Sequence, residues 1–339
     1  MTGRATGAGP PFPASVLPTL LSADIIVPVR NGWELTKTCL ELLQAQTKPH
    51  KVIVCDNGST DGTPERIRET FPDAQVLELG ANLGFTVACN RGVAAGNSDI
   101  AVLLNNDVEC PPDFLERLLT PFGDDPRLGS AAALLLTPGG QHIESFGLAV
   151  DPTLAGYPRL RGSPAPNAQG RNPVLVGPSG AAGAYRREAW DDVRGLDEGV
   201  RFYGEDVDLA LRLRAAGWSS TAVSAATAVH LGSATAAHRS AWQRYEGGFA
   251  RGYFLRRYGV LRGRFAARAA AAEGIVVLGD AIVFSHDLVA LRGRIAGWRA
   301  AAGKARLARP PKAAIDRRIT FLKSVGLRVG VYTEARTSS

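Results

Sequence analysis

The side chains best suited to chemistry are carboxylates and amides that follow apolar runs of the chain. They lie in five polar segments, namely Arg30-Asn31, Asp56 to Asp61, Asn82 to Phe85, Asn105 to Asp107 and Gly204 to Asp208. Hard divalent cations take oxygen ligands, and Mg²⁺ is typically held by one or two carboxylates together with substrate phosphates. Asp107, directly after an apolar run, is therefore a candidate metal ligand; a solvated turn aspartate is the alternative.

A second group of carboxylates opens the segment Gly204-Glu205-Asp206-Val207-Asp208. Acidic residues in the first turn of a helix interact favourably with its dipole. Three carboxylates in four positions exceed what a helix start needs, so one of them is a candidate general base. His230 follows another apolar stretch and becomes a candidate ligand only with a partner such as Asp107, because a lone histidine is more often structural.

Several common catalytic patterns are absent from the sequence. It contains no G-x-S-x-G, no G-x-x-x-x-G-K and no G-x-G-x-x-G, which argues against a serine nucleophile and against the usual NTPase and dinucleotide folds. Cys39, Cys55, Cys89 and Cys110 are irregularly spaced, with no C-x-x-C pair. We expect them to be reduced, packed thiols.

The elements between the polar segments must position these side chains. Apolar runs predict strands over 24–30, 51–55, 76–79 and 100–104, and amphipathic spacing predicts helices over 35–43, 63–70 and 86–95. Alternating strands and helices indicate a parallel sheet covered by helices on both faces. Ligands of such sheets bind at the carboxyl ends of the strands, which is where the first four polar segments would gather.

The charge of the chain is unevenly distributed. The 339 residues are 45% hydrophobic and 21% charged, which excludes a disordered or collagen-like chain. Residues 1–235 hold 19 Lys and Arg against 26 Asp and Glu, net −7, whereas residues 236–339 hold 20 against 6, net +14. The apolar stretch 274–284 is shorter than the ~20 residues of a membrane span, and the N-terminus lacks a signal pattern. We therefore expect a cytoplasmic protein.

Taken in order, five segments resemble the family 2 inverting glycosyltransferases of the GT-A fold, in particular their bacterial rhamnosyltransferase-like branch. The segments are Ile26 to Asn31, Val54 to Gly62, Asn82 to Phe85 with Asn90 to Gly92, Leu104 to Val108, and Gly204 to Arg214. The resemblance covers residues 24 to about 235. It implies an α/β fold with a mostly parallel, Rossmann-like sheet flanked by helices, and a helical basic extension after it.

The resemblance also implies a domain organisation. We expect a flexible N-terminus over 1–20 and a GT-A domain over 21–235, with its nucleotide-sugar half at 21–110 and its acceptor half at 111–235. A helical, Arg-rich region would occupy 236–339.

The resemblance further implies roles for individual residues. The nucleotide-sugar donor would be bound by Pro28, Arg30, Asn31, Asp56, Asn57, Asn82, Gly84, Phe85, Asn90, Asn105, Asn106 and Asp107. Asn105-Asn106-Asp107 stands in place of the family's D-x-D metal motif and carries only one carboxylate. His230 matches the histidine that completes a Mg²⁺ or Mn²⁺ site, and Asp206 matches the catalytic base. Gly180, Tyr203 and Glu205 would meet the acceptor.

The implied reaction moves a sugar, preferably L-rhamnose from dTDP-rhamnose, to a hydroxyl of a saccharide or lipid-linked glycan in cell-envelope polysaccharide synthesis. Another donor such as a UDP-sugar is the main alternative. A sugar-phosphate nucleotidyltransferase should have a Gly-rich loop with Arg and Lys after its first strand, which Arg30-Asn31-Gly32 lacks. Asp107 and Asp206 argue against a non-catalytic sugar-binding relative.

The basic region suggests a partner. A nucleic-acid binder needs aromatic platforms or a recognition helix beside the positive charge, so no nucleic acid is expected. Apolar and basic residues alternate in a way that suits an amphipathic helix lying on anionic lipid, at the cytoplasmic face of a membrane. These residues are Phe249, Tyr253, Phe254, Arg256, Arg257, Leu261, Arg262 and Arg264. Solvated helix faces explain the same charges without a membrane.

Overall fold

The strands and helices expected in the first third of the chain are present, with boundaries close to those predicted. The computed structural model describes residues 21–169, 174–232, 240–284 and 286–329, so the expected flexible segment 1–20 lies outside the described residues. The first elements are β1 (Ala23–Val29), α1 (Trp33–Gln44), β2 (Lys51–Asp56), α2 (Thr63–Thr70), β3 (Gln75–Glu78), α3 (Phe85–Ala95) and β4 (Ile100–Leu104).

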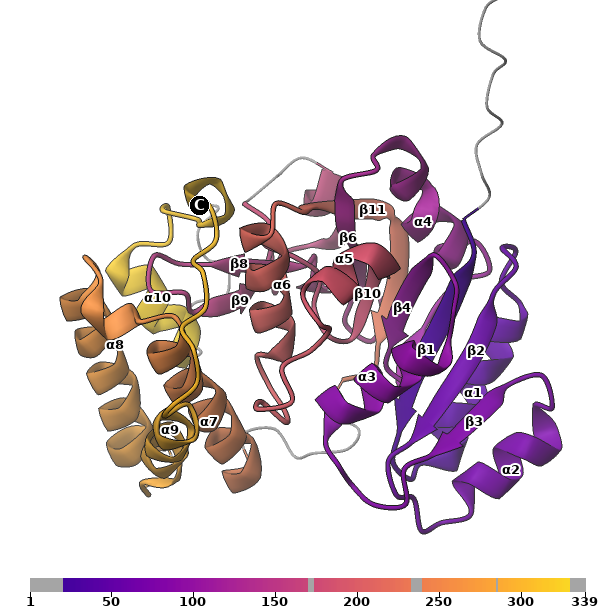
Figure 1. Ribbon diagram of the computed structural model, residues 1–339, viewed down its shortest axis with the longest axis horizontal. Helices are drawn as coiled ribbons and strands as arrows, with labels where there is room; N and C mark the ends of the chain where they lie inside the picture. Colours follow the sequence, from indigo (N-terminus) through magenta and orange to yellow (C-terminus); the bar gives the residue numbers. More distant parts are fainter. Residues whose placement is uncertain (1–20, 170–173, 233–239, 285, 330–339) are drawn as a thin grey trace, which may run out of the picture.

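These strands form one side of a mixed, mostly parallel sheet, which confirms the predicted α/β class (Figure 1). The strand order is β3-β2-β1-β4-β10-β6-β11-β5, and β7 pairs with β6. The pairs among β1 to β4 are parallel, whereas β10 runs antiparallel to both β4 and β6. The further strands are β5 (Val108–Glu109), β6 (Leu128–Leu136), β7 (Ile143–Ser145), β10 (Ala182–Arg186) and β11 (Ser219–His230), and β8 (Leu148–Val150) pairs with β9 (Gly156–Pro158) in a separate ribbon.

Helices cover both faces of the sheet because side chains alternate along each strand. Ile25, Val27 and Val29 of β1 pack into a cluster with α1, α2 and α4 (Phe114–Asp124). Ile26 faces the other way, into a cluster with α3, α5 (Arg187–Asp192) and α6 (Glu205–Ala215). The carboxyl ends of the parallel strands are thereby held rigidly between two packed layers.

The region after residue 240 is helical, as predicted. It contains α7 (Ala241–Arg257), α8 (Ala266–Gly279), the π-helical turn η3 (Asp280–Phe284), α9 (Val289–Ala300) and α10 (Phe321–Val329). The short 3₁₀ turns are η1 (Ala165–Gln169), η2 (Val260–Arg262) and η4 (Lys312–Ala314). In the described part of the chain, no helix combines the length and the apolar character that crossing a membrane requires.

The helix that was expected to lie on lipid is instead packed against the rest of the protein. Tyr253 and Phe254 of α7 are 0% and 4% exposed, and they share a buried cluster with Val207 and Leu211 of α6. Arg257 is engaged with Asp197 through a 3.3 Å ion pair. The amphipathic pattern of α7 thus reflects burial of one helix face against α6, so this helix cannot present Tyr253 and Phe254 to a membrane.

Helices α7 and α9 cross closely through four glycines. A Cβ atom added at Gly248 or Gly252 of α7 would collide with the carbonyl oxygen of Ala290 or Arg294 on α9. In the reverse direction, a Cβ at Gly293 or Gly297 would collide with a carbonyl oxygen of α7. Small residues spaced four apart allow two helix backbones to approach in this way.

Candidate active site

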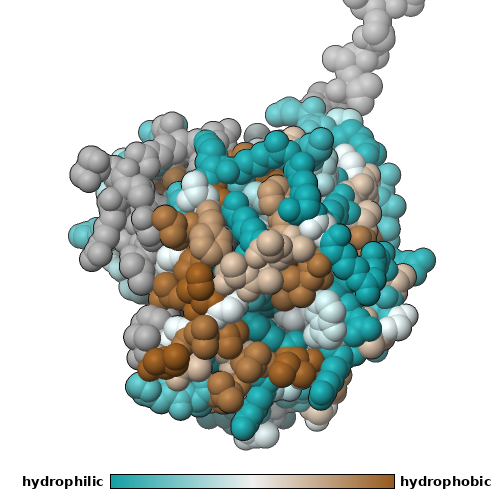
Figure 2. Space-filling model, turned by 90° about the vertical axis from the view of Figure 1, so that its left-hand side faces the viewer, coloured by the Kyte–Doolittle hydropathy of each residue, from teal (hydrophilic) through white to brown (hydrophobic). Residues whose placement is uncertain are grey.

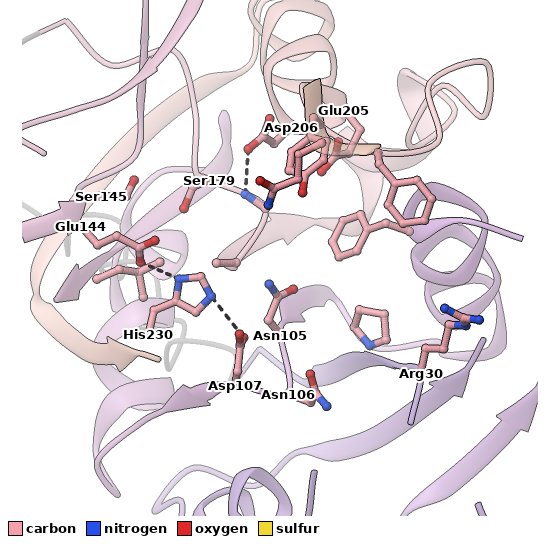
Figure 3. Close-up of a pocket in the computed structure, with 18 of the residues that line it drawn as sticks. Arg30, Asn105, Asn106, Asp107, Glu144, Ser145, Ser179, Glu205, Asp206 and His230 are labelled. Atoms are coloured by element: carbon pink, nitrogen blue, oxygen red, sulfur yellow. Dashed lines mark hydrogen bonds and ion pairs between the residues drawn. The ribbon is translucent and has the colours of Figure 1, made fainter. Parts of the chain in front are cut away.

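A cavity of about 650 Å³ opens where the polar loops meet (Figure 3). Segments from both halves of the predicted GT-A domain line it, together with the first turn of α7. Of the residues predicted from sequence, it contains Pro28, Arg30, Asn57, Asn82, Phe85, Asn105, Asn106, Asp107, Gly180, Tyr203, Glu205, Asp206 and His230. Residues far apart in the sequence are therefore brought to one site.

On one side of the cavity, amide groups connect the loops that follow β2 and β3. The Asn57 Nδ2 group donates to Asn82 Oδ1 at 3.2 Å, and Asn57 Oδ1 accepts from the Leu83 backbone N–H at 2.8 Å. Gly84 has a φ of +96°, and a Cβ there would lie 3.2 Å from Arg201 Cβ. These contacts fix a loop whose next residue, Phe85, begins α3 and lines the cavity.

Four predicted donor residues do not line this cavity, and two of them support its loops. Asn31 Oδ1 accepts from the Thr60 backbone N–H at 2.8 Å, which links the loops after β1 and β2. Gly84 has the positive φ given above and begins α3 as its N-cap. Asn31 and Gly84 therefore support the loops that line the cavity.

The other two, Asp56 and Asn90, are held by hydrogen bonds within the protein. Asp56 is 3% exposed, and its Oδ2 accepts from the Ser59 backbone N–H. Asn90 is used structurally, because its Nδ2 group donates to Leu196 O and to Glu198 Oε1, each at 3.0 Å.

Asp107 is held at the end of β4 by its neighbours in the sheet. Asn105 N–H donates to Ala181 O at 2.9 Å, and Asn106 Nδ2 donates to Thr36 Oγ1 at 2.9 Å. Pairing of β5 with β11 places His230 opposite Val108. The imidazole of His230 thereby reaches Asp107, with Nε2 3.1 Å from Oδ1.

Glu144, on the short strand β7, is the third member of the group formed with Asp107 and His230. It was not predicted from the sequence. Its Oε2 lies 2.5 Å from His230 Nδ1, so the imidazole is held between two carboxylates (Figure 3). Burial by itself lowers the pKa of His230, but the neighbouring carboxylates of Asp107 and Glu144 outweigh it and raise the pKa to about 9.

The same residues are compatible with a divalent cation. Asp107 Oδ1 is buried, and its 3.1 Å contact with His230 Nε2 is not a well-directed hydrogen bond, so this oxygen could take a metal ion as a ligand. A ligating histidine usually donates its other ring N–H to a carboxylate, and Glu144 is placed to accept it. Within the described residues, no three His, Cys, Asp or Glu side chains are grouped as a complete metal site. Asp107 and His230 would therefore be the protein ligands, and substrate oxygens the remainder.

Two adjacent carboxylates face the cavity at the start of α6. Asp206 Oδ2 accepts from the Gly180 backbone N–H at 2.9 Å, while Glu205 is buried with its Oε2 unpaired. Burial raises the pKa of Glu205 to about 8, with the charge of Asp206 adding to the shift, and burial also raises the pKa of Asp206. A Cβ at Gly180 would lie 3.2 Å from Glu205 Oε1, so a glycine keeps this wall open. Asp206, half-buried and hydrogen-bonded, is placed to accept a proton from a bound hydroxyl.

Aromatic rings border the carboxylates. Trp242, in the first turn of α7, packs edge-on against Phe202 and Tyr203 with ring centroids 4.9 and 5.7 Å away. Tyr203 and Trp242 remain 39% and 43% exposed. Phe202 and Trp242 also line the cavity and were not predicted, because nothing in the local sequence links α7 to the loop before α6.

Solved structures share this architecture. A mannosyltransferase from Pyrobaculum calidifontis in complex with GDP-Man and Mn²⁺ aligns with a TM-score of 0.53 at 20% identity, covering 97% of this chain and 86% of that one. GalNAc-T7 with UDP, GalNAc and Mn²⁺ aligns with a TM-score of 0.56 at 13% identity, covering 81% of this chain and 53% of that one. These alignments show that the chain has a GT-A-like fold.

Sequence comparison identifies the family. The model of glycosyl transferase family 2 matches residues 24–194, and that of glycosyl transferase family group 2 matches residues 169–300. The chain belongs to glycosyl transferase family 2, and it is a glycosyltransferase that uses a nucleotide-sugar donor.

Two bacterial relatives show similar levels of identity. The N-acetylglucosaminyl-diphospho-decaprenol L-rhamnosyltransferase of Mycobacterium tuberculosis is 31% identical over 243 residues, covering 61% of this chain and 74% of that protein. An O-antigen biosynthesis protein of Myxococcus xanthus is 31% identical over 207 residues, covering 57% of this chain and 16% of that protein.

Proposed function

We propose that the protein transfers L-rhamnose from dTDP-rhamnose to a hydroxyl of a saccharide carried on a lipid diphosphate, in cell-envelope polysaccharide synthesis. The observation that carries this proposal is the placement of Asp206 and of the Asp107–His230 pair in one cavity (Figure 3). The similarity to the mycobacterial rhamnosyltransferase favours rhamnose as the sugar and a lipid diphosphate as the acceptor class.

The residues of the donor side would bind and orient the nucleotide sugar. Pro28, Arg30, Asn57 and Asn82 would hold the base and ribose, and Asn105 would contact the diphosphate. Asp107 and His230 would hold Mg²⁺ or Mn²⁺, whose chemistry when bound is to neutralise the charge that develops on the departing diphosphate.

Asp206 acts as the general base in a single displacement. The acceptor hydroxyl gives its proton to an Asp206 carboxylate oxygen while its oxygen bonds to the anomeric carbon. The bond from that carbon to the diphosphate breaks, so the anomeric configuration inverts and no covalent enzyme intermediate forms. The N–H of Gly180 fixes one Asp206 oxygen and thereby orients the carboxylate.

We also propose that the protein contacts a membrane through α8. Ile275, Leu278 and Ile282 are 45%, 59% and 65% exposed and recur at helical spacing along α8 and η3. Figure 2 shows apolar side chains gathered on the face formed by the C-terminal helices. The net charge of +14 over residues 236–339 suits anionic lipid. Flotation with anionic vesicles should be lost when these three residues are replaced by Ser, and equal flotation of variant and parent would refute the contact.

A panel of nucleotide sugars tests the main proposal. The protein is incubated with dTDP-rhamnose or UDP-sugars, Mg²⁺ or Mn²⁺, and N-acetylglucosamine linked through a diphosphate to a short prenyl chain. We expect release of dTDP that depends on the acceptor, with a product heavier by one rhamnose. If a UDP-sugar gives product and dTDP-rhamnose does not, the proposed donor is wrong. If no donor gives product, the proposal is refuted.

A further inference from the structure

A second cavity, of about 430 Å³, adjoins the first. The two share Leu148, Pro158, Tyr203 and Asp206. The second cavity lies between the β8–β9 ribbon and the start of α6 on one side, and helices α7 to α10 on the other. A molecule in this second cavity would therefore border the proposed catalytic base.

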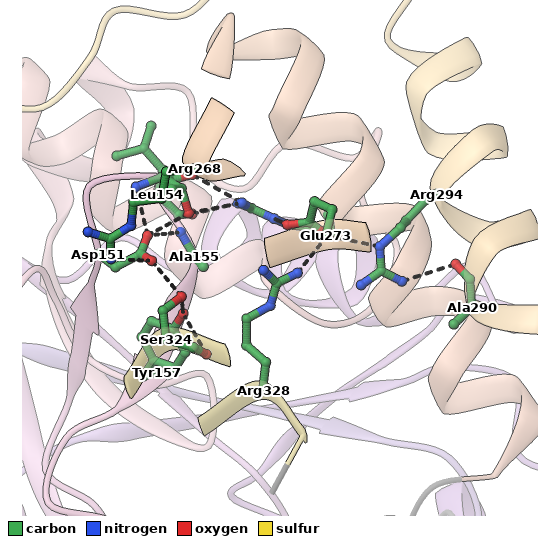
Figure 4. A network of polar contacts seen from close by, with 12 residues as sticks. Asp151, Leu154, Ala155, Tyr157, Arg268, Glu273, Ala290, Arg294, Ser324 and Arg328 are labelled. Atoms are coloured by element: carbon green, nitrogen blue, oxygen red, sulfur yellow. Dashed lines mark hydrogen bonds and ion pairs between the residues drawn. The ribbon is translucent and has the colours of Figure 1, made fainter. Parts of the chain in front are cut away.

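Three arginines of this cavity converge on a single carboxylate. Arg251 of α7, Arg294 of α9 and Arg328 of α10 all pair with Glu273 of α8, at 2.7, 3.0 and 2.5 Å. In Figure 4, Arg294 and Arg328 reach Glu273 from different helices. All three arginines line the cavity.

The cluster carries more positive charge than its carboxylate neutralises. The three guanidinium groups keep only 9%, 14% and 10% of their side-chain surface exposed, and Arg328 Nη1 is buried without a hydrogen-bond partner. Burial lowers the pKa of Arg294; Glu273 opposes this shift, and the charges of Arg328 and Arg251 add smaller contributions that lower the pKa. Asp151, the other buried carboxylate here, is already engaged by Ser324 and Arg268. Unneutralised buried charge is destabilising, so an anionic ligand would relieve the cluster.

The remainder of the cavity is apolar. Leu154, Phe254 and Val276 line it, and Val276 belongs to the helix whose outer side exposes Ile275 and Leu278. A ligand that fits would combine an anionic group with an apolar chain. Planar guanidinium groups bind phosphate oxygens in pairs, which favours a phosphate over a single carboxylate.

We propose that this second cavity binds the diphosphate and the first prenyl units of a lipid-diphosphate-linked acceptor, with Arg251, Arg294 and Arg328 on the diphosphate. The saccharide would then extend past Tyr203 to Asp206, and the lipid would leave along α8. This inference rests on the proposed function for the identity of the acceptor.

The test compares two acceptors that differ in the diphosphate. One is N-acetylglucosamine joined through a diphosphate to a short prenyl chain, and the other is octyl N-acetylglucosaminide. Arg328→Gln removes one charge-assisted contact and should therefore raise the KM for the diphosphate-linked acceptor about tenfold or more. The KM for the octyl glycoside and the KM for the donor should not change. Arg328→Lys should recover part of the loss. Arg299→Gln, at an exposed position on α9, is the matched control and should change neither KM.

Equal changes for both acceptors, or no change for either, would overturn the proposal. A thermal melt of each variant checks that it is folded. Calorimetry with geranyl diphosphate measures the site without turnover, and we expect binding that Arg328→Gln weakens about tenfold. If inorganic pyrophosphate binds as tightly, the lipid part of the proposal is wrong; if geranyl diphosphate does not bind the parent protein, the site is wrong. Binding without transfer to either acceptor would instead contradict the proposed function.

Discussion

The donor side of the active-site cavity and its acceptor side are built in different ways. The donor side consists of loops that directly follow β1 to β4, and hydrogen bonds between neutral groups, such as that from Asn57 to Asn82, connect them. The acceptor side is completed by α7 to α10, whose buried ion pairs converge on Glu273. Substitutions on the donor side should therefore alter binding in a folded protein, whereas substitutions among the C-terminal helices should first alter stability.

The largest effect is expected at the point where the two sides meet. Asp206→Asn removes the base and should lower kcat by about 10²–10⁴-fold, with donor affinity nearly unchanged. Nucleoside diphosphate release and calorimetry with the donor measure the two quantities.

Asp208→Asn is the matched control for this substitution, since Asp208 lies on the same helix turn. It pairs with Arg212 at 2.6 Å and accepts from the Tyr258 hydroxyl at 2.7 Å. This variant should lose stability while kcat stays within a few-fold of the parent value. If turnover is unchanged in Asp206→Asn, Asp206 is not the general base.

Glu273→Gln tests the dependence of the C-terminal helices on their ion pairs. Removing one partner of a buried ionic cluster typically costs about 3–5 kcal/mol, so the free energy of unfolding in urea should fall by that amount. Glu69→Gln, at an exposed position of α2 on the donor side, should change it by less than about 0.5 kcal/mol. Similar values for the two variants would contradict the contrast between the halves.

The close crossing of α7 and α9 gives a smaller effect. Gly252→Ala places a methyl group against the Arg294 carbonyl and should destabilise the protein by about 1–3 kcal/mol. Gly247→Ala lies on the same helix with open space around it, and should be neutral or stabilising by up to about 1 kcal/mol. Thermal melts of both variants measure the difference. If Gly252→Ala and Gly247→Ala have the same melting temperature, the close contact at Gly252 does not stabilise the crossing of α7 and α9.

The smallest effect is expected at Glu144, which contacts His230 Nδ1 and orients its ring. Losing such an outer carboxylate typically weakens metal binding about 10–100-fold. Glu144→Gln should therefore raise the Mn²⁺ concentration needed for half-maximal activity by that factor, with activity restored at saturating metal. Glu109→Gln, at an exposed position of β5, serves as the control. A loss of kcat that excess metal does not restore would contradict a positioning role.

The contrast between the two sides also explains how much the sequence could predict. Local alternation of apolar runs and polar loops predicted β4 over Ile100–Leu104 and α2 over Thr63–Thr70, because a buried parallel sheet leaves a strong local pattern. The helix expected over 35–43 is present as α1, whose buried side chains are Thr36, Cys39, Leu40 and Leu43.

The acceptor side left no comparable pattern. Glu144 lies on a strand of three residues, too short for any period, and Trp242 reaches the site only because α7 packs against α6. Arg251, Arg294 and Arg328 were not predicted as a group from the sequence. Their shared partner, Glu273, becomes visible only when the four helices are assembled.

The anomeric configuration of the product tests most directly whether this cavity transfers a sugar in one displacement. The sugar–acceptor bond formed from the preferred nucleotide sugar can be assigned by the one-bond carbon–proton coupling in NMR. With Asp206 as the base of a single displacement, we predict a configuration opposite to that of the donor. A product with the donor's configuration would contradict the mechanism.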